Sequence, residues 1–310
     1  MNDADNAGNP ASTSDTSRPM RVALVSCSEL PEPDFDEQPL VEAFAARGHE
    51  AAVVPWDEDT APAKALADFD AAVLRSPWNY HERLGEFAAW CDAAAEAVPL
   101  LNTPAVIHWN AHKRYLLELE RAGISIVPTA VVERGAHELG NAHAADGWSA
   151  LVIKPAVGAG SAGARLFAAN KRDSASAYFT ELCGRADALV QPVIPGFADP
   201  GERSIVWIDG EVTHAVTKRP RFDGQDESVI GGAAVTDDER EFAERCVEAA
   251  TTIVGTTPLY ARVDVVMHEG ALVLSELELI EPSLFFEHGL GSAARFVTAT
   301  ERALVEASAD

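Results

Sequence analysis

The segment that decides the fold is "ARVDVVMHEGALVLSELELIEPSLFF", residues 261–286. Its two valine- and leucine-rich runs are typical of buried strands. They nevertheless contain four charged residues: Arg262, Asp264, Glu276 and Glu278. Because successive side chains alternate between the faces of a strand, the first two share one face and the last two share one face of the next strand. A buried charge is costly unless it pairs or holds a metal, so the segment predicts a strand pair with a functional charged face.

The connection around "HEGA", residues 268–271, decides whether these acids meet. A three-residue connection, Glu269 to Ala271, would set Asp264 opposite Glu276, whereas a two-residue turn would send the two acids to opposite sides of the hairpin. With the three-residue connection, Glu278 joins them, and three converging carboxylates suit an oxygen-liganded Mg²⁺ site. The alternative is an ordinary strand pair with a solvated acidic face.

Composition excludes several classes of protein. The chain has 310 residues and a net charge of -25, which argues against binding to nucleic acid, since that requires a basic surface. Four scattered cysteines without a CxxC pair indicate reduced, structural thiols. No apolar run is long enough for a membrane helix, and we expect no membrane partner. Residues 1–19 are polar and lack a signal-peptide core, so we expect a disordered tail on a cytoplasmic protein.

The pattern of strands and helices predicts an α/β domain followed by α+β structure. Between residues 20 and 103, apolar runs alternate with helical patterns, which indicates an open parallel sheet covered by helices. The later strands come in hairpins, of which the Asp209-Gly210 turn is the strongest signal, and a long helix is expected over residues 237–254. We divide this second part into residues 104–190 and 191–310.

The third strand of the first domain ends in "RSPWNY", residues 75–80. Ligands of open α/β sheets bind in the crevice at the carboxyl ends of the strands. We therefore expect Arg75, Ser76, Trp78 and Tyr80 to contact a substrate, with Arg75 gripping a carboxylate through two parallel hydrogen bonds. The alternative is a salt bridge at the end of the strand beside packed aromatic rings.

A glycine-rich loop follows Lys154 in "VIKPAVGAGSAGARLF", residues 152–167. Glycines let backbone N–H groups approach and cradle phosphate oxygens. The spacing matches neither the P-loop nor the dinucleotide-binding motif, and the alternative is a flexible hairpin tip. A lysine within an apolar strand beside such a loop needs an anion, and a phosphate would supply one. The candidate phosphate-binding residues of the loop are Gly158, Gly160, Ser161 and Gly163.

The order of these motifs resembles that of the ATP-grasp ligases. Lys113, Lys154 with its glycine loop, "LVQPVIPG", "ERSIVWIDG", "TKRP", "RVD" and "ELELIEP" follow one another across almost all of residues 20–310. The stretch "GERSIVWIDGEVTHAVTKRP" is similar to bacterial glutathione synthetase, and "RSPWNY" with "ELELIEPSLFF" resembles O-ureido-serine cyclo-ligase of the cycloserine pathway. The resemblance implies an open parallel-sheet domain, residues 20–103, followed by two α+β subdomains that clamp ATP.

The resemblance also implies roles for single residues. Lys113 and Lys154 would contact the ATP phosphates, with the glycine loop as a lid. Gln191 and the Val193 backbone would bind adenine, and Glu202, or alternatively Asp199, would bind the ribose. The Mg²⁺ ligands would be Asp264, Glu276 and Glu278, although Glu278 stands where the family usually has Asn. The segment "IEPSLFF" also replaces the more frequent small-residue "PG" ending.

The implied reaction is the ATP-dependent ligation of a carboxylate to an amine. The substrate carboxylate would attack the γ-phosphate, and an amine would displace phosphate from the resulting acyl phosphate. Arg262 would stabilise the oxyanion of the second step, while Lys218 and Arg203 would orient the acceptor; structural salt bridges are the alternative for these last two. The expected partner is a small amino-acid-like molecule with a carboxylate.

Three other interpretations of the function stay open. Intermolecular peptide-type joining would use the same residues as ring closure. A catalytically inactive nucleotide-binding sensor would bind ATP without turnover. A small-molecule receptor built on the first domain would be indifferent to ATP and Mg²⁺. A homodimer is the default expectation for the oligomeric state.

Overall fold

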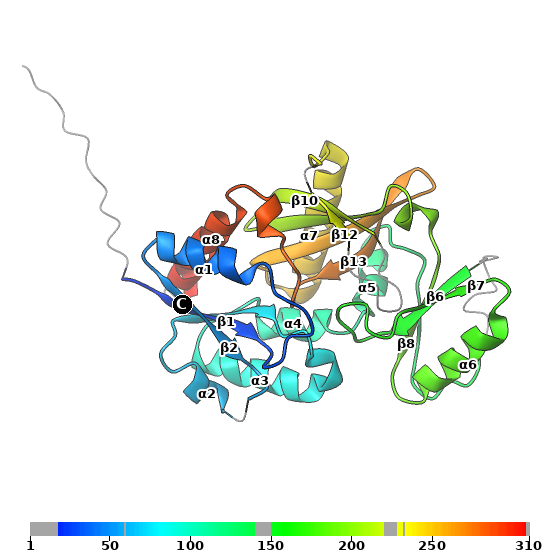
Figure 1. The fold of residues 1–310 in the computed structure, drawn as a ribbon, viewed down its shortest axis with the longest axis horizontal. Coiled ribbons are helices and arrows are strands. Elements are labelled where there is room, and N and C mark those ends of the chain that lie inside the picture. Colours follow the sequence, from blue (N-terminus) through cyan, green and yellow to red (C-terminus); the bar gives the residue numbers. More distant parts are fainter. Residues whose placement is uncertain (1–17, 59, 140–149, 220–227, 232, 308–310) are drawn as a thin grey trace, which may run out of the picture.

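The computed structural model describes residues 18–58, 60–139, 150–219, 228–231 and 233–307. The predicted tail of residues 1–19 lies almost wholly outside this part, as does Pro220 of "TKRP". In the part of the chain that the structure describes, strands form three sheets (Figure 1). The division into residues 20–103, 104–190 and 191–310 stays a prediction, and its boundary at residue 190 falls within a strand of the second sheet.

The first sheet is parallel, as the alternation of strands and helices predicted. It consists of β1 (Arg21–Ser26), β2 (Glu50–Pro55), β3 (Ala71–Ser76) and β4 (Leu100–Leu101) in the order β2-β1-β3-β4. On one face lie α2 (Pro62–Ala65) and α3 (Leu84–Ala97), and on the other α1 (Glu37–Ala46) packs beside the C-terminal helix α8 (Ser292–Ala307) (Figure 1). The last helix of the chain therefore completes the N-terminal layer.

The second sheet is a smaller lobe at one end of the molecule (Figure 1). Its strands are β5 (Ala130–Val132), β6 (Ala150–Pro155), β7 (Arg165–Ala168) and β8 (Ala188–Pro192), in the antiparallel order β5-β8-β6-β7. Helix α6 (Arg172–Cys183) covers it with Tyr178, Phe179 and Leu182. The glycine-rich loop connects β6 to β7.

The third sheet is antiparallel and contains the predicted strand pair with the four charged residues. It contains β9 (Glu202–Ile208), β10 (Glu211–Arg219), β11 (Ser228–Ile230), β12 (Tyr260–His268) and β13 (Ala271–Glu278), in the order β11-β10-β9-β12-β13. Asp209 and Gly210 both have a positive φ, 51° and 84°, which confirms the predicted tight hairpin between β9 and β10. Two helices that precede the second sheet, α4 (Pro104–Asn110) and α5 (Tyr115–Arg121), pack near β13; α4 was not predicted.

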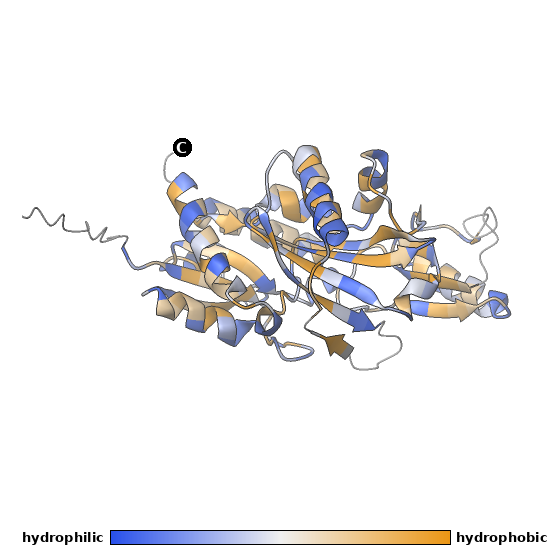
Figure 2. Ribbon diagram, turned by 90° about the horizontal axis from the view of Figure 1, so that it is seen from above, coloured by the Kyte–Doolittle hydropathy of each residue, from blue (hydrophilic) through white to orange (hydrophobic). Residues whose placement is uncertain are grey.

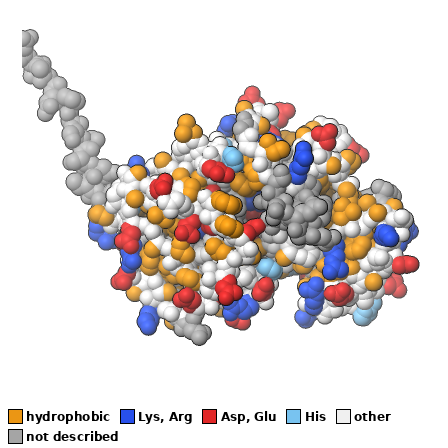
Figure 3. Space-filling model, viewed as in Figure 1, with side chains coloured by type: hydrophobic (Ala, Val, Ile, Leu, Met, Phe, Trp, Pro, Cys, Tyr) orange, Lys and Arg blue, Asp and Glu red, His pale blue; other side chains and the backbone are white. Residues whose placement is uncertain are grey.

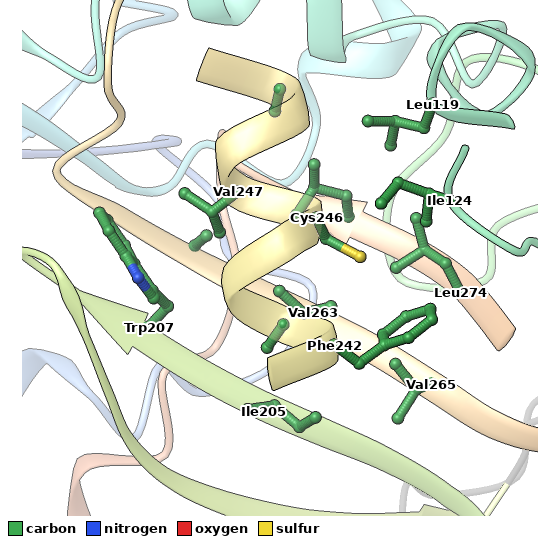
Figure 4. Packing of buried hydrophobic residues seen from close by; sticks show 14 of the residues in the cluster. Leu119, Ile124, Ile205, Trp207, Phe242, Cys246, Val247, Val263, Val265 and Leu274 are labelled. Atoms are coloured by element: carbon green, nitrogen blue, oxygen red, sulfur yellow. The ribbon is translucent and has the colours of Figure 1, made fainter. Parts of the chain in front are cut away.

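Helix α7 (Asp237–Val254) covers the outer face of this sheet and has the predicted bounds. A capping box of Thr236 and Glu239 begins the helix, and Gly255, with φ 82°, ends it. Figure 4 shows Phe242, Cys246 and Val247 directed towards the sheet. The residues that they meet there include Ile205, Trp207, Val263, Val265 and Leu274. This core fixes one face of the sheet, so the opposite face is available for function.

The connection between β12 and β13 is the shorter of the two that the sequence left open. His268 pairs with Ala271, so the turn has two residues, Glu269 and Gly270, rather than three. Asp264 nevertheless pairs with Glu276, because the register shifts by one residue between Asp264 and Val265. The extra residue is Ser275, and such a bulge reverses the alternation of side chains beyond it.

The bulge explains how β13 places leucines in the core on one face of the sheet and glutamates on the other face. Leu274 before it and Leu277 and Leu279 after it all lie in the core beneath α7. In a regular strand of the same sequence without a bulge, Leu274 would share its face with Glu276 and Glu278. The bulge therefore turns both glutamates away from the core.

The surface and the cysteines agree with the composition. Figure 2 shows largely hydrophobic strands, with helices that also carry hydrophilic residues, and on the face drawn in Figure 3 acidic side chains are interspersed with Lys and Arg. All four cysteines are free and buried, as predicted. Among the described residues, no helix combines the length and the apolar character that crossing a membrane would require.

Candidate active site

A cavity of about 770 Å³ lies where the three sheets meet. Trp78 and Tyr80 reach it from the end of β3, and the glycine-rich loop borders it beside β6. Lys154 on β6, Asp264 on β12 and Glu276 on β13 line its walls. Near the middle of the molecule in Figure 2, blue residues interrupt the orange strands. The charges noted in the sequence therefore face a shared interior space.

At the centre of the charged wall, Glu276 pairs with two lysines. Lys113 Nζ lies 2.9 Å from Glu276 Oε2, and Lys154 Nζ is ion-paired with Glu276 Oε1. Burial would raise the pKa of the Glu276 carboxyl group, but the two lysines hold it below its ordinary value. Burial would lower the pKa of Lys113, but Glu276 holds it above its ordinary value. Glu276 and Lys113 therefore retain their charges near neutral pH.

A second group of charges surrounds Arg262. Its Nε lies 2.9 Å from Asp264 Oδ1 and its Nη2 lies 2.9 Å from Asp264 Oδ2, which is the two-pronged geometry that guanidinium and carboxylate groups favour. Arg262 also pairs with Glu278, and Lys218 Nζ lies 3.0 Å from Asp264 and 3.5 Å from Glu202. Burial would raise the pKa of Asp264, but Arg262 and Lys218 keep it lowered.

The three predicted metal ligands share the cavity face, but each already has a cationic partner. Asp264 and Glu276 are register partners on neighbouring strands, and Glu278 faces Arg262. Among the described residues, no group of three His, Cys, Asp or Glu side chains is arranged to hold a metal ion by itself. Carboxylate oxygens are nevertheless the donors that Mg²⁺ prefers, and Mg²⁺ commonly needs only one or two of them beside substrate phosphates. The donor set therefore fits Mg²⁺ that arrives with a nucleotide.

Most of the predicted nucleotide-binding residues line the cavity. They are Lys113, Lys154, Gly158, Gly160, Ser161, Gln191, Val193 and Glu202. Gly163 lies just outside the lining, where its carbonyl accepts a hydrogen bond from the Tyr178 hydroxyl group. The Val193 N–H already donates to the Ala150 carbonyl, 3.0 Å away, so this N–H is not available to adenine. Asp199, the alternative to Glu202, does not line the cavity.

Besides Gly163, three predicted site residues are not brought into the cavity. Arg203 faces the opposite side of β9 from Glu202, and its Nε lies 2.7 Å from Glu239 Oε1 at the start of α7. Ser76 is buried and donates to Ser26 Oγ over 3.0 Å. Arg75 is 2% exposed and donates to the Pro282 carbonyl over 2.8 Å, with Asp36 at 3.5 Å. These contacts match the structural alternatives rather than contact with a substrate.

Sequence reasoning missed Glu281, which lines the cavity beside Trp78 and Tyr80. Burial first, and then the nearby charge of Glu278, raises the pKa of Glu281 to about 8. The available signal was an acid directly after the apolar pair Leu279 and Ile280. Asn110 was also missed; its amide group bonds the Leu277 carbonyl and the Leu279 N–H, and so secures β13.

The arrangement of the three sheets resembles that of solved ATP-grasp proteins. The chain matches the crystal structure of a RimK domain ATP-grasp protein from Sphaerobacter thermophilus with a TM-score of 0.63, at 23% identity over 90% of this chain and 98% of the other. It matches a D-alanine–D-alanine ligase from Bacillus anthracis, complexed with ATP, with a TM-score of 0.62, at 14% identity over 93% and 98%. The chain therefore has the ATP-grasp fold.

A more specific similarity links the chain to cycloserine synthetase. A family model described as the N-terminal domain of the D-cycloserine synthetase DcsG matches residues 22–102. The cycloserine biosynthesis protein DcsG of Streptomyces lavendulae is 29% identical over 299 residues, which are 90% of this chain and 97% of that protein. The crystal structure of D-cycloserine synthetase DcsG superposes with a TM-score of 0.83, at 28% identity over 92% of this chain and 99% of the other.

The raised pKa of Glu281 predicts how its removal changes stability with pH. Between the ordinary pKa of a glutamate, about 4.3, and the folded value of about 8, the folded protein holds a proton that the unfolded chain releases. Wild-type stability therefore falls as pH rises through this window. Glutamine does not titrate, so Glu281→Gln lacks this fall in stability with pH. The free energy of unfolding of Glu281→Gln relative to that of wild type should therefore increase by about 2 to 4 kcal/mol between pH 5 and pH 9.

Urea unfolding of both proteins at pH 5, 7 and 9 measures this difference. Glu82→Gln, at an exposed acid on the same cavity, controls for the loss of a carboxylate. A stability difference between Glu281→Gln and wild type that does not change with pH would contradict the burial of an ionisable Glu281.

Proposed function

We propose that the protein joins the carboxyl carbon of a small amino-acid-like substrate to a nitrogen atom of the same molecule, through an acyl phosphate made from ATP. The observation that carries the proposal is the pairing of Lys113 and Lys154 with Glu276 on the wall of the large cavity. Similarity to cycloserine synthetases over nine-tenths of the chain supports ring closure rather than joining of two molecules.

ATP would lie between the second and third sheets. Lys113 and Lys154 would bind its phosphates beneath the loop that carries Gly158, Gly160 and Ser161. Gln191, which is buried on β8, would lie beside adenine, and the Val193 carbonyl rather than its N–H would be the backbone group in contact with it. Glu202 would bind the ribose. In this proposal the phosphates replace Glu276 as the partner of both lysines.

Glu276, once released from the lysines, would hold Mg²⁺ together with Asp264 and Glu278. Bound Mg²⁺ neutralises charge on the phosphate oxygens and so supports phosphoryl transfer. The depressed pKa values of Glu276 and Asp264 keep both carboxylates ionised, as a metal ligand must be. The Arg262 pairs with Asp264 and Glu278 would keep these carboxylates in place.

The chemistry has two balanced steps. A substrate carboxylate oxygen attacks the γ-phosphorus of ATP, the bond to the β,γ-bridging oxygen breaks, and ADP leaves. A substrate nitrogen then attacks the carboxyl carbon, loses its proton, and expels phosphate as the carbon–oxygen bond breaks. Lys154 and Lys113 would stabilise the charge of the transferring phosphoryl group, and Arg262 would stabilise the oxyanion of the second step. Lys218 would hold the substrate carboxylate; Arg203 has no such role, because it faces α7.

ADP release measured against a panel of substrates, with products identified by mass spectrometry, tests the proposed function. The panel contains O-ureidoserine, single amino acids and dipeptides, with ATP and Mg²⁺. We expect ADP release to depend on O-ureidoserine or a related amino acid, and to yield a cyclic product made from one substrate molecule. A product that contains two joined molecules would replace ring closure by intermolecular ligation. ATP binding without release by any member would favour the nucleotide sensor.

Glu276→Gln separates the two roles proposed for this residue. The variant cannot hold Mg²⁺ as a carboxylate does, so we expect kcat to fall at least about 100-fold. It also frees both lysines, so ATP binding without Mg²⁺ should be as tight as in wild type or tighter. Isothermal titration and steady-state kinetics measure the two effects. Glu269→Gln, in the exposed turn of the same hairpin, is the matched control; unchanged turnover in Glu276→Gln would refute the metal role.

A further inference from the structure

Four Asp and Glu side chains are buried in the described part of the chain, and one of them stands apart. Asp36 lies 3.5 Å from Arg75, Glu239 pairs with Arg203 at 2.7 Å, and Asp264 pairs with Arg262 at 2.9 Å. Glu281, which is 9% exposed, forms no ion pair with any described residue. A buried carboxylate needs a partner for its charge, and this one faces the cavity, where a ligand could supply that partner.

The structure holds Glu281 in a fixed position. Its backbone carbonyl accepts a hydrogen bond from Trp78 Nε1 over 3.1 Å, and the next residue's carbonyl accepts one from Arg75 Nη2. The Asp36 carboxylate accepts bonds from three successive backbone N–H groups, of residues 284–286. The segment after β13 is therefore clamped to the first sheet, and binding would require little reordering of this acid.

The surroundings of Glu281 also give its ligand an orientation. Tyr80 lines the cavity together with Glu281, and the charges of Glu278, Lys113 and Arg262 act on the Glu281 carboxyl group. The cations Lys113, Lys154, Lys218 and Arg262 line the same cavity and suit phosphate and carboxylate groups. An anionic group of a ligand would face these cations, while a cationic group would face Glu281. An amino acid carries both charges on one carbon atom.

We infer that Glu281 binds the α-ammonium group of the substrate, with Trp78 and Tyr80 beside it, and so selects amino acids over their deaminated analogues. The inference rests on the proposed function, since it assigns one end of the substrate that this site would ligate. The ammonium group supplies the positive charge that Glu281 lacks, and Glu281 becomes ionised on binding. The nucleophile of the ligation is then a second, uncharged nitrogen, because a protonated amine has no lone pair with which to attack.

A comparison of two substrates in two proteins tests the inference by turnover. We would measure kcat/KM for O-ureidoserine and for its analogue with hydrogen in place of the amino group. Wild type should prefer the amino acid by about 10- to 100-fold, as a charge-assisted hydrogen bond at a buried site allows. In Glu281→Gln that preference should fall to within about threefold, with KM for ATP unchanged within about twofold. Glu82→Gln, an exposed acid on the same cavity, should keep the wild-type preference.

A binding experiment keeps the inference separate from the proposed function. Titration of wild type and Glu281→Gln with serine and with 3-hydroxypropanoate, each in the presence of ADP, needs no turnover. If wild type binds serine more tightly than 3-hydroxypropanoate and Glu281→Gln does not, the inference is supported. This holds even if O-ureidoserine is not turned over, since a lack of turnover would refute only the proposed substrate. The inference is overturned if Glu281→Gln, with a wild-type melting profile, retains the full preference or weakens both ligands equally. It is also overturned if wild type binds neither ligand.

Discussion

The site depends on one carboxylate that is shared by two lysines. Glu276 comes from β13, Lys154 from β6 in a different sheet, and Lys113 from the connection between α4 and α5. These three groups come from distant parts of the sequence, and their pairing joins the second sheet to the third across the cavity. A phosphate that binds the lysines, as we propose, would also free Glu276, so the same contact would link nucleotide binding with assembly of the proposed metal site.

The first sheet supports this site from outside the cavity. Arg75 and Asp36, both buried, bind the backbone of residues 282–286, which directly follow β13. Arg262 Nη1 donates to the Ser283 carbonyl of the same segment over 3.3 Å. Arg75 and Asp36 thus position the wall of the site, while Trp78 and Tyr80 are the side chains of "RSPWNY" that reach the cavity. Arg75, at the end of β3, therefore has a structural role, although its position in the sequence suggested contact with a ligand.

Regular patterns in the sequence were enough to predict much of the fold. Alternating strands and helices predicted the parallel sheet, and helix α7 and the Asp209-Gly210 hairpin lie where local signals placed them. The pairing of Asp264 with Glu276 was expected for the wrong reason, because a bulge at Ser275 rather than a longer turn sets the register. A bulge depends on what packs against each face of the sheet, here the α7 core on one face and the cavity on the other. The sequence of one strand alone therefore does not predict it. The positions of Arg75 and Arg203 depend similarly on distant partners, Pro282 and Glu239, that only the folded chain brings close.

The central claim is that ATP activates a carboxylate of the substrate, and oxygen labelling tests it most directly. The substrate would carry oxygen-18 in both carboxylate oxygens, and the phosphate released during a single turnover with ATP would be analysed by mass spectrometry. An acyl phosphate requires one labelled oxygen to pass from the carboxylate to the phosphate as the new carbon–nitrogen bond forms. Labelled phosphate in equal amount to the product is therefore the predicted result. Unlabelled phosphate, released together with a product that has lost one heavy oxygen to water, would contradict the account.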